Sequence, residues 1–195
     1  MQRKFFHRHL HAIQADIQTK GYRASLLNYW YEFTHKAWFR KRQVQFPDLS
    51  WKEADTREMS AHKDAHANQF SSFYIIEKAF HKIPLPASEI SMLDIGCGCG
   101  RAMVVGMKNR FKKVSGVELD PDALFLAERN CQHMFRHGFK TPYELKGADA
   151  SNCRIPEGTN VIYLFNPFGR LGKSRYCMCI LHMLIKKISK SSGVP

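Results

Sequence analysis

The sequence predicts an α/β protein with an open parallel sheet of about four strands, helices on both faces and a helical N-terminal extension. Two observations support this prediction. From residue 90 onwards, short apolar runs alternate with segments of helical spacing, which is the pattern of parallel strands joined by right-handed crossovers. Before residue 87, apolar residues recur at helical spacing instead. We therefore expect a helical extension over residues 1–86 and an α/β domain over residues 87–195.

The extension contains three stretches in which apolar residues recur every three or four positions, as on one face of a helix. They cover residues 6–17, 22–37 and about 58–82. The apolar stripe of the second stretch consists of Tyr22, Leu26, Tyr29 or Trp30, Phe33 and Ala37. Such stripes need a surface to lie on, so we expect them to pack on the rest of the protein.

The α/β domain alternates strands and helices in order. The expected strands cover residues 90–95, 114–119, 143–146 and 160–165, and the expected helices cover residues 101–111, 121–135 and about 176–190. The middle helix has the clearest signals, because Asp120 offers an N-cap oxygen, Pro121 suits the first turn and Gly138 suits the end. The fourth strand is almost wholly apolar, as expected for a strand buried on both faces.

A glycine-rich turn follows the first strand. Gly96, Gly98 and Gly100 allow sharp backbone dihedral angles and let a ligand approach the main chain without meeting a Cβ atom. The dinucleotide fingerprint places its third glycine three residues after the second, where this chain has Arg101. A nucleotide-like ligand is therefore indicated, but the NAD form of the motif does not fit.

Three acidic residues lie at the ends of three successive strands. Asp94 is inside the first strand, Glu118 ends the second and Asp149 follows the third. The carboxyl ends of parallel strands meet in one crevice, where open sheets bind ligands. The two oxygens of Glu118 could there accept both hydroxyls of a ribose. Each acid alone could be a solvated or capping carboxylate, but the convergence of all three favours a binding site.

Four segments resemble, in order, the motifs of class I S-adenosylmethionine-dependent methyltransferases, especially a small bacterial branch with "GCGxGR", "GVE" and "NPF" motifs. The segments cover residues 93–101, 114–121, 147–150 and 164–168. The resemblance implies a Rossmann-like sheet with the strand order 3-2-1-4, S-adenosyl-L-methionine as the cofactor and methyl transfer as the reaction. Two upstream elements, at residues 55–56 and 69–73, resemble the family segment that folds over the cofactor.

The resemblance also implies a role for each site residue. Those expected to face the methionine end of the cofactor are Asp94, Gly96, Cys97, Gly98 and Gly100. Those expected around its nucleoside are Glu118 at the ribose hydroxyls, Leu119 beside the adenine, and Asp149 with Ala150 at the adenine amino group.

Asn166 and Phe168 are the expected catalytic residues, and by resemblance they would hold a target amino nitrogen. The second proline of that family motif is missing here. The alternative, a turn that ends the strand and a core phenylalanine, stays open, and the methyl acceptor is unidentified.

Composition and charge bear on whether the chain is a nucleic-acid-binding, membrane, secreted or metal-binding protein. The 195 residues carry a net charge of +13, divided as +6 over residues 1–51, +1 over residues 52–157 and +6 over residues 158–195. The basic ends are expected to be solvated, so a nucleic-acid partner is possible but not favoured. No apolar run is long enough to span a membrane, and the N-terminal residues lack the apolar stretch of a secretory signal, so export is not expected. We expect a cytoplasmic protein with six reduced cysteines and no metal site.

A complete sheet of this family has seven strands, whereas this chain is expected to have four. The sequence therefore predicts a C-terminally truncated domain in which the fourth strand is an exposed edge, open to a partner or a second copy. Two alternative functions follow: a non-catalytic remnant that keeps only the cofactor half, and a basic nucleic-acid-binding module.

Overall fold

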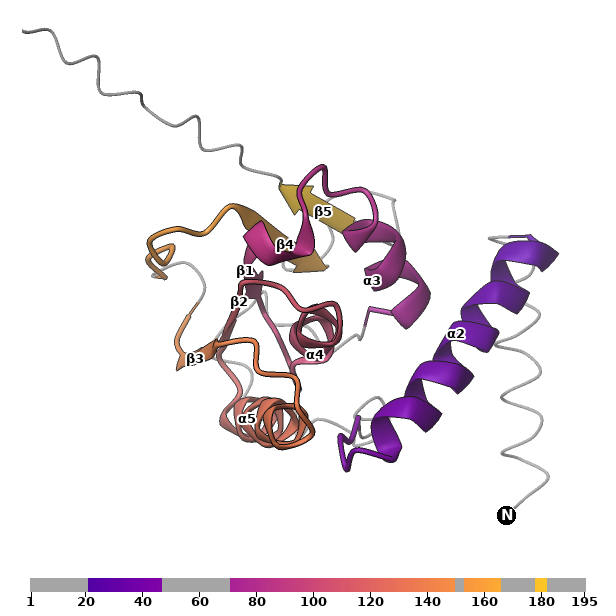
Figure 1. The fold of residues 1–195 in the computed structure, drawn as a ribbon, viewed down its shortest axis with the longest axis horizontal. Coiled ribbons are helices and arrows are strands. Elements are labelled where there is room, and N and C mark those ends of the chain that lie inside the picture. Colours follow the sequence, from indigo (N-terminus) through magenta and orange to yellow (C-terminus); the bar gives the residue numbers. More distant parts are fainter. Residues whose placement is uncertain (1–20, 47–70, 150–152, 166–177, 182–195) are drawn as a thin grey trace, which may run out of the picture.

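The computed structural model describes residues 21–46, 71–149, 153–165 and 178–181 (Figure 1). Its helices are α2 (Tyr22–Arg40), α3 (Phe73–Phe80), the 3₁₀ helix η3 (Ala87–Glu89), α4 (Arg101–Lys108) and α5 (Pro121–Arg136). Its strands are β1 (Ser91–Ile95), β2 (Lys113–Glu118), β3 (Tyr143–Gly147), β4 (Val161–Phe165) and β5 (Met178–Leu181). None of the described helices is both long and apolar enough to cross a membrane.

The strands form one sheet in the order β3-β2-β1-β4-β5. The first four strands in this order run parallel, with Asp94 of β1 paired in register between Gly116 of β2 and Tyr163 of β4. The predicted parallel sheet with the order 3-2-1-4 is therefore confirmed. Its register brings the carboxyl ends of β1 and β2 together at one edge, where ligands bind in sheets of this kind.

The fifth strand is a correction to the sequence prediction. Residues 178–181 were expected in a helix over about 176–190, but they form β5, which pairs antiparallel with β4. A short apolar run fits a buried helix or a strand equally well, and here the free edge of β4 supplies backbone partners. In the described sheet β4 is therefore paired on both sides, and the prediction that it is an open docking edge is wrong.

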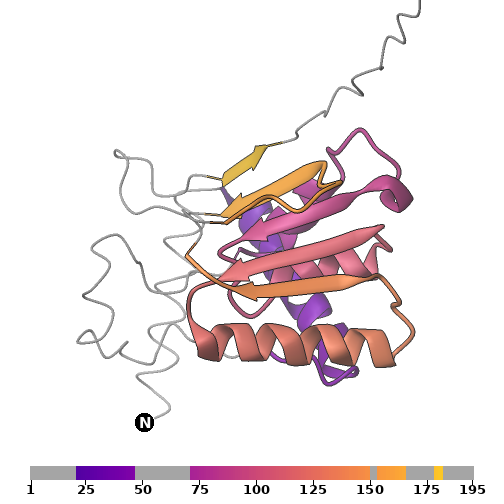
Figure 2. The same ribbon diagram turned by 90° about the vertical axis from the view of Figure 1, so that its left-hand side faces the viewer.

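The described helices lie on one face of the sheet. Because β1, β2 and β3 step in the same direction, the helices that connect them, α4 and α5, fall on the same side (Figures 1 and 2). Helix α3 lies beside α4 on this face, next to β4, and α2 packs against α3 farther from the sheet (Figure 1). No described helix covers the opposite face, so the expected second helical layer is not found among the residues that the structure describes.

The face of helix α2 that packs on the rest of the protein is not the apolar stripe that the sequence predicts. Trp30 and Phe33 of that stripe are 62% and 71% exposed. The buried residues are instead Ser25 and Phe39, and the half-buried Glu32 lies on the same side. Periodicity missed this face because polar and charged residues, which form hydrogen bonds inside the protein, occupy much of it.

The extension and the sheet share one hydrophobic core. Phe39 of α2 stacks on Phe73 of α3, with ring centroids 5.4 Å apart. Phe80, at the other end of α3, contacts both Phe111 before β2 and Tyr163 of β4. The described part of the extension is thus built into the α/β core, while the division of the whole chain at residues 86 and 87 stays a prediction.

Helix α5 begins where its capping signals predict. The Asp120 carboxylate accepts hydrogen bonds from the amides of Asp122 and Ala123, at 2.9 and 3.4 Å, and Pro121 occupies the first turn. Gly138 follows the helix with φ of +91°. The helix packs on β2 and β3, and it thereby supports the part of the sheet that lies next to the glycine turn.

Removing this cap should have a measurable cost. The Asp120→Ala variant should lose about 1 kcal/mol of unfolding free energy, because two amides at the start of α5 lose their acceptor. Urea denaturation measures the loss. Asp120→Asn keeps an acceptor oxygen and should recover most of the stability; equal losses in the two variants would show that the cap contributes little.

Candidate functional site

The predicted glycine turn joins β1 to α4 at the carboxyl edge of the sheet. Gly96, Gly98 and Gly100 have φ of +73°, +52° and +76°, a left-handed conformation that residues with a Cβ atom disfavour. The amides of Gly96 and Cys97 both donate to the carbonyl oxygen of Val117, at 2.9 and 3.0 Å. These bonds fasten the first half of the turn to β2.

Two of these glycines serve different purposes. A Cβ atom at Gly100 would lie 3.2 Å from the Cβ atom of Ala127, so this glycine allows α5 to pack closely on the turn. A Cβ atom at Gly96 would meet nothing within 4 Å. The main chain at Gly96 therefore borders open space, as a backbone that is to meet a ligand requires.

Glu118 lies directly beside the turn, as predicted. Its Oε2 atom accepts a hydrogen bond from the Gly98 amide at 2.7 Å, and its Oε1 atom accepts from the amides of Leu119 and Asp120 at 2.8 and 3.0 Å. The side chain is buried. A carboxylate has about four lone-pair positions, so Oε2 keeps one with which it can accept a further hydrogen bond.

Asp94 is fully enclosed under the turn. Its residue is only 3% exposed, and burial, reinforced by the negative charge of Glu118, raises the pKa of its carboxyl to about 8. The structure thus brings Asp94 and Glu118 together, as the ends of neighbouring strands predict. A strongly shifted acid in a convergent polar site is typical of functional sites.

The other predicted site residues divide into two groups. Asp149 follows β3 at the same edge of the sheet, where the Ala148 amide donates to the carbonyl oxygen of Glu118 at 3.1 Å. Leu119 is half exposed at the end of β2. Ala150, Asn166 and Phe168 lie outside the described residues. The assigned roles of all these residues stay predictions.

Three residues at this edge were not predicted as site residues. The Tyr163 hydroxyl donates to Ser71 Oγ at 2.8 Å, and burial raises the pKa of that tyrosine above its usual value. Arg101, directly after the turn, donates to the Ser71 carbonyl oxygen at 3.0 Å. Two of these residues lie in segments that resemble the family: Arg101 ends the motif at residues 93–101, and Ser71 belongs to the segment at residues 69–73 that resembles a cover over the cofactor.

The thiols near the turn are poorly suited to nucleophilic chemistry. Cys97, Cys99 and Cys131 are buried and free, and burial raises the pKa of each thiol, to about 12 for Cys99. Cys153 is also free. Within the described ranges, no group of three or more His, Cys, Asp or Glu side chains could hold a metal ion.

Comparison with known proteins finds a methyltransferase that is similar in sequence to part of the chain. No protein-family model matches the chain. A ribosomal protein L11 methyltransferase from Lachnospira eligens is 27% identical over 127 residues, which cover 61% of this chain and 37% of that protein. The chain thus spans little more than a third of the length of this curated relative.

Solved structures resemble parts of the chain. An RNA methyltransferase from Salinibacter ruber, in complex with S-adenosyl-L-homocysteine, has 18% identity and a TM-score of 0.43 over 49% of this chain and 60% of its own. A tRNA (uracil-54, C5)-methyltransferase from Pyrococcus abyssi, in complex with the same compound, has 19% identity and a TM-score of 0.36 over 52% of this chain and 32% of its own.

The sequence match and the strand order lead to one conclusion. The curated relative is a methyltransferase, and the parallel strands have the order 3-2-1-4 that the motifs imply. The Rossmann-like fold and the resemblance to class I methyltransferases are therefore confirmed.

Proposed function

We propose that the chain binds S-adenosyl-L-methionine at the carboxyl edge of β1 and β2 and transfers its methyl group to an acceptor. One observation supports this most directly. The amide of Gly98, the middle one of the three left-handed glycines in the turn, donates a hydrogen bond to Glu118 Oε2 at 2.7 Å. Main chain and carboxylate thus face the same open edge, where a nucleoside and its amino-acid tail could lie side by side.

The residues present fit this cofactor. The remaining acceptor position on Glu118 Oε2 suits a ribose hydroxyl, and the open space above Gly96 suits a ligand that lies against the main chain. A positive charge on a ligand beside the buried Asp94 carboxyl would lower the pKa of that acid and favour its charged form, so the position suits such a ligand. Leu119, Asp149 and Ala150 remain the proposed contacts of the adenine.

Methyl transfer depends more on the alignment of acceptor, methyl carbon and sulfur than on proton transfer. When bound, the cofactor would supply a methyl group on a positively charged sulfur. The acceptor's lone pair would form a bond to the methyl carbon, in line with the carbon–sulfur bond, and the electron pair of the broken carbon–sulfur bond would stay on the sulfur, which becomes neutral. In this proposal the residues of the chain orient the reactants. The glycine turn and Glu118 hold the cofactor, and the hydrogen bond between Tyr163 and Ser71 borders the proposed site on the side of β4. A dedicated acid or base is optional in such a reaction.

We further propose an amino nitrogen as the acceptor. The Asn166-Pro167-Phe168 sequence resembles the motif of amino-group methyltransferases, and the curated relative is named for a ribosomal protein substrate. In this proposal the amide oxygen of Asn166 accepts a hydrogen bond from the target nitrogen, and the ring of Phe168 packs against it.

Calorimetric titration with S-adenosyl-L-homocysteine tests the site. The Asp94→Ala and Glu118→Ala variants should each bind about tenfold more weakly or worse, because each removes a buried carboxyl group beside the ligand. Glu144→Ala is the matched control, since Glu144 is an exposed acid on the edge strand β3, where it pairs with Lys113 of β2. Circular dichroism checks that the variants are folded.

Two outcomes would count against the proposal. Unchanged affinity in both variants would remove the site assignment. Tight binding with no methyl transfer to any fraction of a cell extract would favour the non-catalytic alternative.

A further inference from the structure

A buried arginine links the glycine turn to the N-terminal helices. Arg101 is the first residue of α4 and only 7% exposed. Its Nη1 atom donates to both carboxylate oxygens of Glu32 in α2, at 3.1 and 3.2 Å, and to the carbonyl oxygen of Ser71, at 3.0 Å. Its guanidinium carbon lies 4.5 Å from the ring centroid of Phe73 and 5.2 Å from that of Phe46.

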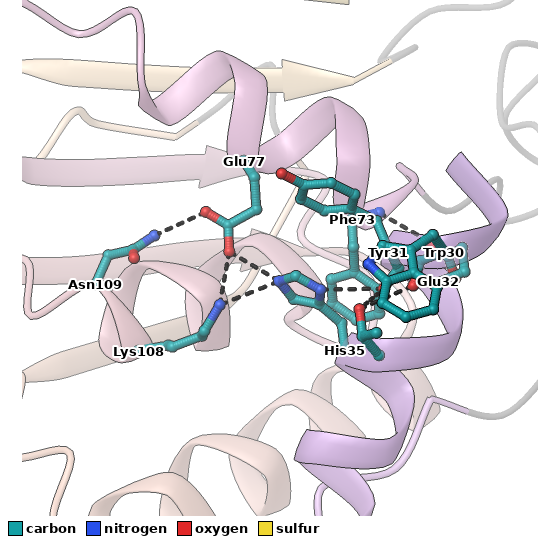
Figure 3. Close-up of polar contacts among 9 residues, drawn as sticks. Trp30, Tyr31, Glu32, His35, Phe73, Glu77, Lys108 and Asn109 are labelled. Carbon is teal, nitrogen blue, oxygen red and sulfur yellow. Dashed lines mark hydrogen bonds and ion pairs between the residues drawn. The ribbon is translucent and has the colours of Figure 1, made fainter. Parts of the chain in front are cut away.

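Glu32 completes this link on the side of the extension. Its Oε1 atom also accepts a hydrogen bond from the Phe73 amide at 2.7 Å, as Figure 3 shows. One carboxylate therefore joins α2, the first residue of α3 and the residue that follows the glycine turn. We call the Arg101–Glu32 pair, with its bonds to Ser71 and Phe73, the clasp.

A second contact reaches the turn from the same extension. Asn130 of α5 is buried, and its side chain exchanges two hydrogen bonds with the backbone of Gln45, at 2.9 and 2.8 Å. The same amide nitrogen donates to the carbonyl oxygen of Cys99 at 2.9 Å. The second half of the turn is therefore held from two sides, by Asn130 at Cys99 and by the clasp at Arg101.

These contacts matter because the turn itself is intrinsically loose. Its three glycines lose more conformational entropy on ordering than any other residue type would. A ligand that had to order the turn would spend part of its binding free energy on that ordering. Contacts that order it beforehand leave more of this free energy for affinity.

We propose that Arg101 and Glu32 are positioning residues for the cofactor: docking of α2 through the clasp holds the glycine turn in its ligand-binding conformation. This inference rests on the proposed function. It makes the helical extension a determinant of cofactor affinity, coupled to the site in both directions.

The structure offers a matched control at the other end of α4. There Glu77 of α3 accepts hydrogen bonds from Lys108 at 2.8 Å and from Asn109 at 3.3 Å, and it pairs with His35 of α2 at 2.8 Å (Figure 3). Burial alone would raise the pKa of Glu77, but bonds to His35 and Lys108 lower it to about 2. This network joins the same helices about 10 Å along α4 from the turn.

The test compares Glu32→Gln with Glu77→Gln. Both variants replace a carboxylate that bridges the same three helices with an amide, so both should lower the urea midpoint of unfolding. Only Glu32→Gln should weaken binding of S-adenosyl-L-homocysteine, by about tenfold, within the 5–150-fold range typical of coupled sites. Equal dissociation constants in the two variants would overturn the inference and leave the clasp a purely structural contact.

Hydrogen exchange of the wild-type protein supplies a second readout that needs no variant. Because coupling is reciprocal, saturating S-adenosyl-L-homocysteine should slow amide exchange in residues 22–40 of α2. Unchanged exchange there, despite binding, would contradict the inference even if Glu32→Gln fails to fold. If the wild type binds no S-adenosyl-L-homocysteine at all, the proposed function fails first, and the inference fails with it.

Discussion

Replacing Asp94 with asparagine should remove a large pH dependence from the stability of the protein. The folded state raises the pKa of Asp94 from 3.8 to about 8, chiefly through burial. Below about pH 4 the carboxyl is protonated in both the folded and the unfolded state. Between pH 4 and 8 the unfolded chain releases this proton while the folded protein keeps it, so the wild type should lose stability as the pH rises.

The loss is complete above the folded pKa of about 8, and it should amount to several kcal/mol, since each pKa unit corresponds to about 1.4 kcal/mol. Urea denaturation of the wild type and of Asp94→Asn, from pH 4 to 9, measures the difference between their slopes. Glu144→Gln, at an exposed acid, should follow the wild type. Parallel curves for the wild type and Asp94→Asn would show that Asp94 titrates normally.

A valine at Gly116 should destabilise the protein strongly. Even one Cβ atom at this position would lie 2.5 Å from Met103 Sδ, 2.8 Å from Cys97 Sγ and 2.9 Å from Leu145 Cδ2. Overpacking of this kind typically costs 1–3 kcal/mol. Because valine adds two further methyl groups, we expect about 3 kcal/mol in urea denaturation.

Gly147→Ala is the control for this change. This glycine also lies in a strand, but its added Cβ atom would meet only the flexible end of Leu124, at 3.1 Å. We expect a clearly smaller loss. A similar loss in both variants would mean that strand glycine itself, and not the crowding around Gly116, determines the cost.

Local rules predicted the parts of the structure that depend on neighbours in sequence. Helix α5 begins at its aspartate and proline, and the glycine turn forms where three glycines alternate. Glu118 also followed from the sequence, because the end of a strand fixes the edge of the sheet on which its side chain must lie.

Contacts between distant segments could not be predicted in the same way. Arg101 and Glu32 are 69 positions apart, and nothing around either residue marks it as buried. The apolar stripe of α2 pointed to the wrong face, because an ion pair and a stacked aromatic ring decide which side is buried. The β5 error has a similar origin, since the pairing of residues 178–181 with β4 determines their structure.

The shared aromatic core also bears on how the chain folds. The stacking of Phe39 on Phe73 and the bond of Tyr163 to Ser71 close loops of 34 and 92 residues. Such long loops lose entropy before their contacts form, so they slow folding. A chain synthesised without residues 21–46 would lack Phe39 and would leave part of the Phe73 ring in water.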